Sequence, residues 1–288
     1  MSYTLEDFDY IDSHCHFFPP QIFKSIWKFF EVPDNEGDPR GWNIKYKLST
    51  DSLVKFLENH RVKNFTTYNY AHKSGIADYI NKWTYELIRK NKQAIPFGCV
   101  WPDDANRVDY IQKLFDDYKF FGLKLQLLVQ DFYPDDSRMH DIYNLVVDRG
   151  KWINFHVGTA PYRNKYVGYK HFKKFIEKYP DMNVIVAHLG TYESHKFFKL
   201  LDKYDNLYLD TAMVYLPMTF SKLWKKNVKL PTTEDLIAHE DRILYGSDFP
   251  NIPYDYNQSI EGLLDLNLPK SFYDKVFYEN AKRIFGIN

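Results

Sequence analysis

The sequence is poor in cysteine and has no excess charge of either sign. Its 288 residues include 2 cysteines, and 38 lysine and arginine residues balance 38 aspartate and glutamate residues. Cys15 and Cys99 form no Cys-x-x-Cys motif, so neither a disulfide framework nor a cysteine-bound zinc site is predicted. The balanced charge offers no electrostatic footprint for nucleic acid or for an anionic membrane. A small-molecule partner is therefore expected, in a reducing, cytoplasmic setting.

Signals for export or membrane insertion are also missing. The N-terminus contains Glu6 and Asp7 where a signal peptide would have basic residues before an apolar stretch. No apolar run approaches the ~20 residues that a membrane-spanning helix needs. The sequence thus predicts a soluble, unprocessed protein. The oligomeric state is left open, and a homodimer is one arrangement that the sequence allows.

Aromatic residues, by contrast, are abundant. The chain has 24 tyrosines and 23 phenylalanines, and 44% of its residues are hydrophobic. This side-chain bulk is enough for a large core, so a disordered chain is not expected. A chain of this length could form one large domain or two ordinary ones, and α/β barrels often use it as a single domain.

Short apolar runs alternate with amphipathic stretches along almost the whole chain. The runs read as strands at residues 10–16, 62–67, 95–100, 122–126, 152–156, 183–188, 207–210 and 242–247. Helical spacing of apolar residues starts at residue 51, after Ser49 or Thr50 as N-cap. It recurs at residues 76–90, 107–118, 139–148, 169–178, 194–203, 234–239, 260–266 and 272–285. Such alternation favours a parallel sheet.

About eight strand–helix units fit a (β/α)₈ barrel, with a doubly wound open sheet as the competitor. The open sheet would need a glycine-rich phosphate turn, and neither GxGxxG nor GxxxxGK[ST] occurs. We therefore predict an α/β fold, a single TIM-type barrel over residues 1–288. Residues 17–49, with several prolines and aromatic residues, are predicted to be an insertion that covers the active-site rim. The alternative is an insertion packed on the outside.

Polar side chains with metal-binding chemistry stand at the ends of these predicted strands. His14 and His16 end the first strand, His156 the fifth and His188 the sixth, while Asp248 follows the eighth. One histidine in a strand is more often a satisfied core group. The carboxyl ends of barrel strands meet at one rim, however, so five such groups together predict one site. Alternation along the first strand also places Asp12 on the same face as His14 and His16.

The segments around these residues resemble the amidohydrolase superfamily. They are residues 12–16, 155–158, 187–190, 245–250 and 279–286. More narrowly, the chain resembles the amidohydrolase-related group, TIM barrels that include aminocarboxymuconate-semialdehyde decarboxylase and many predicted hydrolases. The resemblance implies one divalent metal ion, most often zinc, bound by His14, His16, His156 and Asp248. It also implies catalytic roles for Asp248, which can accept a proton, and for His188, just beyond the metal.

Charged and aromatic residues near the predicted rim are assigned to the substrate. Lys124 has three interpretations: a carbamylated bridge between two metals, as in binuclear relatives, a core lysine paired with a carboxylate, or a ligand for an anionic substrate group. Arg163, in the loop after His156, could serve the last of these. Trp27, Trp101 and Trp224 are predicted to line the pocket, because small-molecule sites usually have apolar and aromatic walls.

Two reactions fit the same ligand set. The first is hydrolysis of a small lactone, amide or ester-like substrate through a metal-activated water. The alternative is the non-oxidative, metal-dependent decarboxylation of an aromatic or dienoic acid, because a metal can polarise a substrate for either reaction. A metal-binding barrel without turnover is a further alternative. The sequence does not identify the substrate, the metal or the number of metals.

Overall fold

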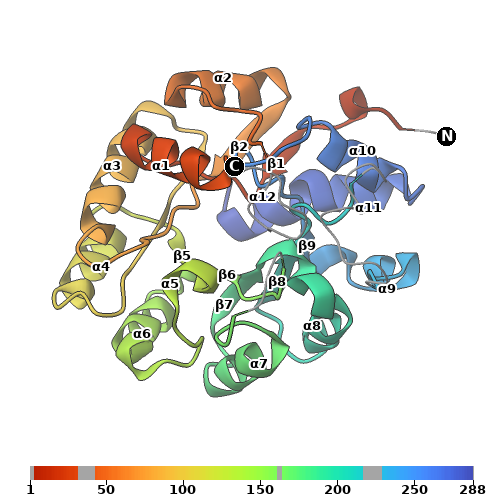
Figure 1. The fold of residues 1–288 in the computed structure, drawn as a ribbon. Helices are drawn as coiled ribbons and strands as arrows, with labels where there is room; N and C mark the ends of the chain where they lie inside the picture. The colour runs from red at the N-terminus through yellow and green to blue at the C-terminus, as the bar shows by residue number, and fades with distance from the viewer. Residues whose placement is uncertain (1–2, 32–42, 161–163, 217–228, 288) are drawn as a thin grey trace.

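The computed structural model describes residues 3–31, 43–160, 164–216 and 229–287 (Figure 1). The strands are β1 (Tyr10–Asp12), β2 (Val62–Thr66), β3 (Ala94–Ile95), β4 (Phe97–Gly98), β5 (Gly122–Gln126), β6 (Trp152–His156), β7 (Asn183–Val186), β8 (Leu207–Asp210) and β9 (Ile243–Leu244). The α-helices are α1 (Pro20–Phe30), α2 (Thr50–Asn59), α3 (Ala77–Lys90), α4 (Arg107–Asp116), α5 (Leu127–Gln130), α6 (His140–Asp148), α7 (Tyr169–Lys178), α8 (Ser194–Leu201), α9 (Thr233–Ala238), α10 (Gln258–Leu264), α11 (Lys270–Asp274) and α12 (Asn280–Phe285). Each predicted strand overlaps an observed one.

All strand pairs are parallel, and neighbours in the sheets are neighbours in the chain. The orders are β1-β2-β3 and β4-β5-β6-β7-β8-β9. In Figure 1 the strands lie in the middle, and most of the helices surround them. Over the described residues the ladders form two arcs and not one closed sheet. Parallel strands in chain order with helices outside them are the architecture of an α/β barrel, so the predicted fold class is confirmed.

The gap between the two arcs lies at Pro96, inside the predicted third strand. Proline has no backbone N–H to give to a ladder, so the strand is divided into β3 and β4. Thr67, just after β2, links the two halves: its N–H donates to the Ile95 carbonyl at 3.1 Å. Its Oγ1 accepts from the Phe97 N–H at 3.2 Å. The two arcs therefore stay connected across the proline.

The segments after β1 and β9 lie side by side at the other seam of the barrel. Three backbone hydrogen bonds join them: Ser13 N to Tyr245 O (2.9 Å), Asp248 N to His14 O (2.8 Å) and His16 N to Phe249 O (2.7 Å). Two of these bonds involve residues predicted to hold the metal. These hydrogen bonds thus bring the first and last parts of the predicted site together.

Side chains from several strands fill the inside of the barrel. This inner cluster contains Ile11, Tyr68, Ile95, Phe97, Ile185, Tyr208 and Leu244. Ala281 and Phe285 of α12 pack against it, and the Phe285 ring lies 4.9 Å from that of Phe121. The barrel interior is thus a packed core, as is usual for this architecture.

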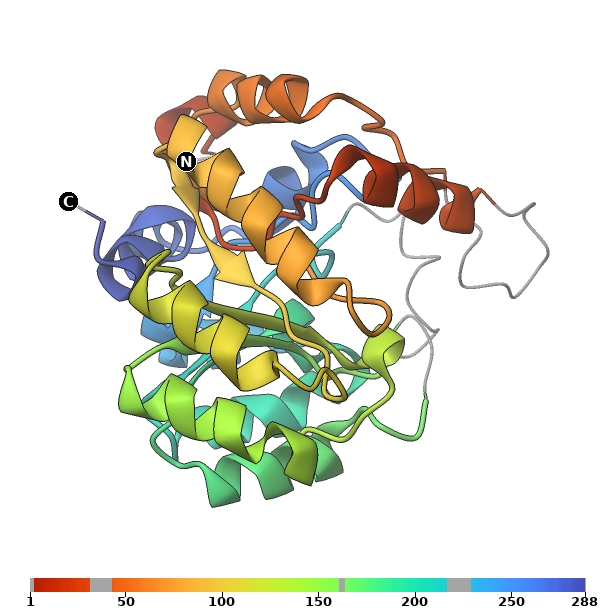
Figure 2. The ribbon, with the colours of Figure 1, turned by 90° about the vertical axis from the view of Figure 1, so that its left-hand side faces the viewer.

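The described parts of the 17–49 segment contact the loops that follow β2 and β9. The Phe18 ring packs edge-on against Tyr70, with centroids 5.1 Å apart. The Lys45 N–H donates to the Ile252 carbonyl at 2.9 Å. In Figure 2, α1 lies toward the right, as does the loop between β2 and α3. Residues 32–42 lie outside the described residues, and the role of the whole segment as a cover stays a prediction.

Several helix ends follow their sequence signals. Ser49 caps α2, as predicted, because its side chain accepts from the Ser52 N–H. Thr232 and Asp235 form a capping box at α9. In the described part of the chain, no helix combines the length and the apolar character needed to cross a membrane.

Candidate metal centre

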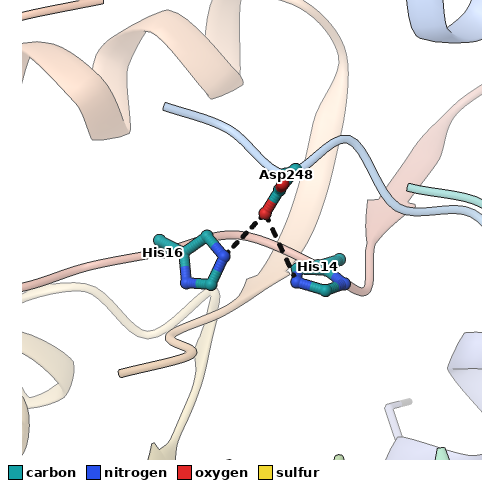
Figure 3. Close-up of side chains that lie close together, drawn as sticks. All are labelled: His14, His16 and Asp248. Atoms are coloured by element: carbon teal, nitrogen blue, oxygen red, sulfur yellow. Dashed lines mark hydrogen bonds and ion pairs between the residues drawn. The ribbon is translucent and has the colours of Figure 1, made fainter. Parts of the chain in front are cut away.

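Three of the predicted ligands meet at the seam between the first and last strands (Figure 3). His16 Nε2 lies 2.6 Å from Asp248 Oδ1, and His14 Nε2 lies 3.4 Å from the same oxygen. His14 and His16 are buried, and Asp248 is largely so. Their ligand atoms lie close enough together to hold one metal ion.

Asp12 does not face these histidines, so the expectation from strand alternation is wrong. β1 ends at Asp12, and its carboxylate accepts hydrogen bonds from the His14 N–H (3.1 Å), the Ser247 hydroxyl (2.5 Å) and the Tyr256 hydroxyl (2.8 Å). Burial raises the pKa of Asp12 to about 6, against these hydrogen bonds, which lower it. The carboxylate thus ties the His14 segment to the residue before Asp248 instead of joining the site.

A second group that could hold a metal consists of His14, His188 and Asp210. His14 Nδ1 lies 2.9 Å from Asp210 Oδ2, and the His188 N–H donates to Asp210 Oδ1 at 2.9 Å. Asp210 was not among the predicted site residues. The signal for it was present, because it ends the predicted strand 207–210, as the histidines end theirs.

His188 follows β7 in a turn of left-handed residues rather than at the strand end. The backbone φ angles are +58° at His188, +51° at Leu189 and +77° at Gly190. A β-carbon at Gly190 would lie 2.1 Å from a ring atom of Phe197, so only glycine fits there. Such backbone strain is common at functional sites.

His156 joins the cluster through His188. Its Nδ1 lies 3.2 Å from His188 Nε2, and its Nε2 lies 3.1 Å from the Ala160 carbonyl. It belongs to neither of the two groups that could hold a metal among the described residues. Its predicted role as a ligand, and that of His188 just beyond the metal, stay predictions.

The hydrogen bonds of the four histidines assign their tautomers. Each ring has one nitrogen beside an oxygen that can only accept: His14 Nδ1 beside Asp210 (2.9 Å), His16 Nδ1 beside the Tyr68 carbonyl (3.0 Å), His156 Nε2 beside the Ala160 carbonyl (3.1 Å) and His188 Nδ1 beside the Ala212 carbonyl (2.8 Å). A neutral imidazole has a single N–H, so these contacts place it on the nitrogen just named for each ring. The second nitrogen of His14, His156 and His188 then carries a lone pair, whereas His16 Nε2 also lies beside an acceptor, Asp248 Oδ1 at 2.6 Å.

The lone pairs of His14, His156 and His188 face other acceptors or one another. His14 Nε2 is buried without a hydrogen-bond partner and faces the Asp248 carboxylate. His156 Nδ1 faces His188 Nε2. A proton on His16 would satisfy only its own contact with Asp248. Since lone pairs repel one another, the donor set fits a cation placed among these groups.

The electrostatics also favour the ligand forms of these groups. Burial, aided by the charge of Lys124, lowers the pKa of His14 well below its ordinary value. Burial and the charge of His188 do the same for His156. Burial alone would raise the pKa of Asp248, but the hydrogen bond from His16 and the neighbouring charges lower it below its usual range. Neutral imidazoles and an ionised carboxylate are the forms that bind metals.

The residues predicted to contact the substrate are only partly described. Lys124 is fully buried, and its Nζ donates to Asn154 Oδ1 at 2.6 Å. Trp27 is half-buried on α1, and Trp101, also half-buried, follows β4. Arg163 and Trp224 lie outside the described residues. The substrate roles of all five stay predictions.

Gly246 gives a direct test of the packing behind His14. A β-carbon at this glycine would lie 2.6 Å from the His14 β-carbon. We expect Gly246→Ala to lose about 1–3 kcal/mol of stability through overpacking and to weaken metal binding, because His14 must move. Thermal unfolding and metal titration measure the two effects.

Gly98→Ala is the control for this substitution. Its β-carbon would lie 2.5 Å from a Leu114 methyl, away from the histidines. It should lower stability without changing metal affinity. Equal metal affinity in both variants would contradict a role for Gly246 in placing His14.

Comparison with solved structures places the fold among TIM barrels. An uncharacterized TIM-barrel protein from Bordetella bronchiseptica has 17% identity and a TM-score of 0.71, over 97% of this chain and 99% of that one. 5-Carboxyvanillate decarboxylase from Novosphingobium aromaticivorans, solved with manganese and a nitrobenzoic acid ligand, has 14% identity and a TM-score of 0.71, over 99% and 100%. A probable 2-pyrone-4,6-dicarboxylic acid hydrolase from Acinetobacter baumannii has 14% identity and a TM-score of 0.67, over 97% and 100%.

These similarities show the fold, and they include both a decarboxylase and a hydrolase. Among curated proteins, none matches this chain. A family model described as amidohydrolase, however, matches residues 11–287, nearly the whole chain. The match includes His14, His16, His156, His188 and Asp248, and it confirms the resemblance drawn from the motifs. The chain belongs to the amidohydrolase family.

Proposed function

We propose that this chain is a metal-dependent hydrolase acting on a small lactone, amide or ester-like substrate. The observation that carries the metal site is His14 Nε2, a buried nitrogen that faces Asp248 at 3.4 Å without a hydrogen-bond partner. His14, His16 and Asp248 would hold one divalent ion, with His156 as the predicted further ligand. Imidazole and carboxylate ligands suit zinc, which we take as the metal. Manganese, present in the decarboxylase structure, is the alternative.

A divalent ion held here would polarise a carbonyl and lower the pKa of a water to about 7. The protein's own groups would then move the protons. Asp248, kept ionised by His16 and His14, can accept a proton. His188 Nε2 carries a lone pair, because Nδ1 donates to the Ala212 carbonyl. It can take up a proton from one atom and return it to another.

Decarboxylation of an aromatic or dienoic acid is the second candidate. It is supported by the similarity over 99% of this chain to 5-carboxyvanillate decarboxylase. In that reaction His188, once protonated at Nε2, would deliver the proton to the carbon that loses the carboxyl group. In hydrolysis His188 would thus first take up a proton, whereas in decarboxylation it would first donate one.

The deciding experiment is turnover in ¹⁸O-labelled water. Purified protein is first analysed for metal and then screened against lactones, amides, esters and aromatic carboxylates. Hydrolysis puts the label into the product and releases no CO₂. CO₂ release with an unlabelled product would reject the hydrolase in favour of the decarboxylase. Asp248→Asn serves as the inactive control against a contaminating enzyme.

A barrel that binds metal without turnover predicts a third result. Such a protein would contain metal at full occupancy and would convert no substrate of either class. This outcome would reject both enzymatic proposals while leaving the metal site intact.

A further inference from the structure

Lys124 is a fully buried cation with an unusual partner. It lies in β5, and its Nζ donates to Asn154 Oδ1 at 2.6 Å and lies 5.1 Å from the centre of the Tyr68 ring. Among the described residues, no ion pair includes Lys124. A buried lysine usually has a carboxylate partner, so the choice of an amide requires an explanation.

Asn154 connects the lysine to the candidate metal centre. It is the partner of Lys124 across the β5–β6 ladder, and it too is fully buried. Its Nδ2 donates to Asp210 Oδ2 at 3.2 Å, and the same oxygen accepts from His14 Nδ1 at 2.9 Å. A continuous chain of hydrogen bonds therefore runs from Lys124 through Asn154 and Asp210 to His14.

The groups at the two ends of this series of hydrogen bonds determine which atom of Asn154 donates and which accepts. An ammonium group can only donate, and an ionised carboxylate can only accept. Asn154 satisfies both only when its oxygen faces Lys124 and its N–H faces Asp210. The reversed amide would place an oxygen against the carboxylate and N–H groups against the ammonium. Lys124 thus excludes that orientation.

We propose that Lys124 is a positioning residue that acts through Asn154 and Asp210 on His14. By holding the amide, it keeps Asp210 as the acceptor for His14 Nδ1–H, which leaves the lone pair on Nε2 facing Asp248. Outer partners of this kind orient a metal-binding imidazole and raise its basicity. The inference rests on the proposed metal site, and it gives Lys124 a role without contact to the substrate.

The test is a double-mutant cycle on Co²⁺ affinity, measured by chelator competition and by visible absorption of bound Co²⁺. Lys124→Met and Asn154→Leu should each weaken binding about 10-fold or more. Because Lys124 acts through Asn154, the double variant should bind no more weakly than Asn154→Leu alone. The absorption spectrum of Co²⁺ should also change in both single variants, since the His14 ring is no longer held.

The outcomes distinguish a failure of the positioning role of Lys124 from a failure of the proposed metal site. Wild-type protein that binds no Co²⁺ would reject the proposed function. Wild-type binding with an unchanged affinity in Lys124→Met, or with losses that simply add in the double variant, would reject the positioning role alone. Lys151→Met, at a half-buried lysine over the Phe115 ring, should leave Co²⁺ binding unchanged. A fall there as large as in Lys124→Met would also reject the positioning role.

A further variant serves if Lys124→Met fails to fold. In Asn154→Asp the new carboxylate still accepts from Lys124 but cannot donate to Asp210. Co²⁺ affinity should then fall as it does in Asn154→Leu. An unchanged affinity would overturn the proposal.

Discussion

A variant with alanine at both His14 and His16 is expected to keep its fold and lose its metal. His14 Nε2 and His16 Nε2 face Asp248 Oδ1 from 3.4 Å and 2.6 Å, and no other described pair of histidines approaches that carboxylate so closely. An outer partner of a ligand is worth 10- to 100-fold in affinity, so two ligands together should be worth on the order of 10³-fold or more. Metal analysis after dialysis, with circular dichroism as a check on the fold, measures this loss.

A matched control removes two histidines from the surface. His72 and His195 are exposed, so a His72→Ala, His195→Ala variant should keep its full metal content. The proposed site would be wrong if the His14, His16 variant also kept full metal content while remaining folded. The metal would then have to be held by other groups.

Much of the fold was predictable from local patterns. Apolar runs such as residues 122–126 and 152–156 became β5 and β6 with the predicted bounds. His14, His16 and Asp248 were expected to lie together because the carboxyl ends of barrel strands meet at one rim. This rule needs only the strand ends and their order. Position along a strand is a local property, and the shared rim follows from the parallel topology.

What the sequence did not reveal was which side chains bind one another across the barrel. Asp12 was expected beside the histidines, but β1 ends there, and the carboxylate bonds to Ser247 and Tyr256 instead. Asp210 ends a predicted strand as the histidines do, but nothing in the sequence indicates its bond to His14 or distinguishes Asn154 from an ordinary strand residue. Hydrogen bonds between residues 30 to 244 positions apart depend on the packed barrel and leave no local pattern.

The turn at His188 also has little signal in the sequence. The run 183–188 reads as one strand, but β7 ends at Val186, and four residues with positive φ, His188 to Thr191, follow. Gly190 was the one visible signal, and its closeness to Phe197 appears only in the fold. The turn moves the His188 ring so that it lies between His14 and His156, with ring centroids 4.8 Å and 4.7 Å away.

Replacement of His188 by asparagine is expected to remove turnover and keep the metal. Its Nδ1 is held by the Ala212 carbonyl, so the ring presents Nε2 to the cluster as a group that takes up and returns a proton. Asparagine cannot carry a proton in this way, and loss of a general acid or base typically costs about 10²–10⁴-fold in rate. The backbone N–H of residue 188 still donates to Asp210 in the variant, so the support of His14 remains.

Three measurements decide this prediction: the metal content, the turnover number and the dependence of turnover on pH. The metal content should match the wild type, while the residual rate should lose the pH dependence that proton transfer at His188 imposes. His195→Asn, on the exposed side of α8, should change none of the three. If His188→Asn turns over at the wild-type rate, proton transfer belongs to another group, and Asp248 would be the first to test. If it loses its metal together with its activity, His188 is itself a ligand, as its place beside His14 and Asp210 allows.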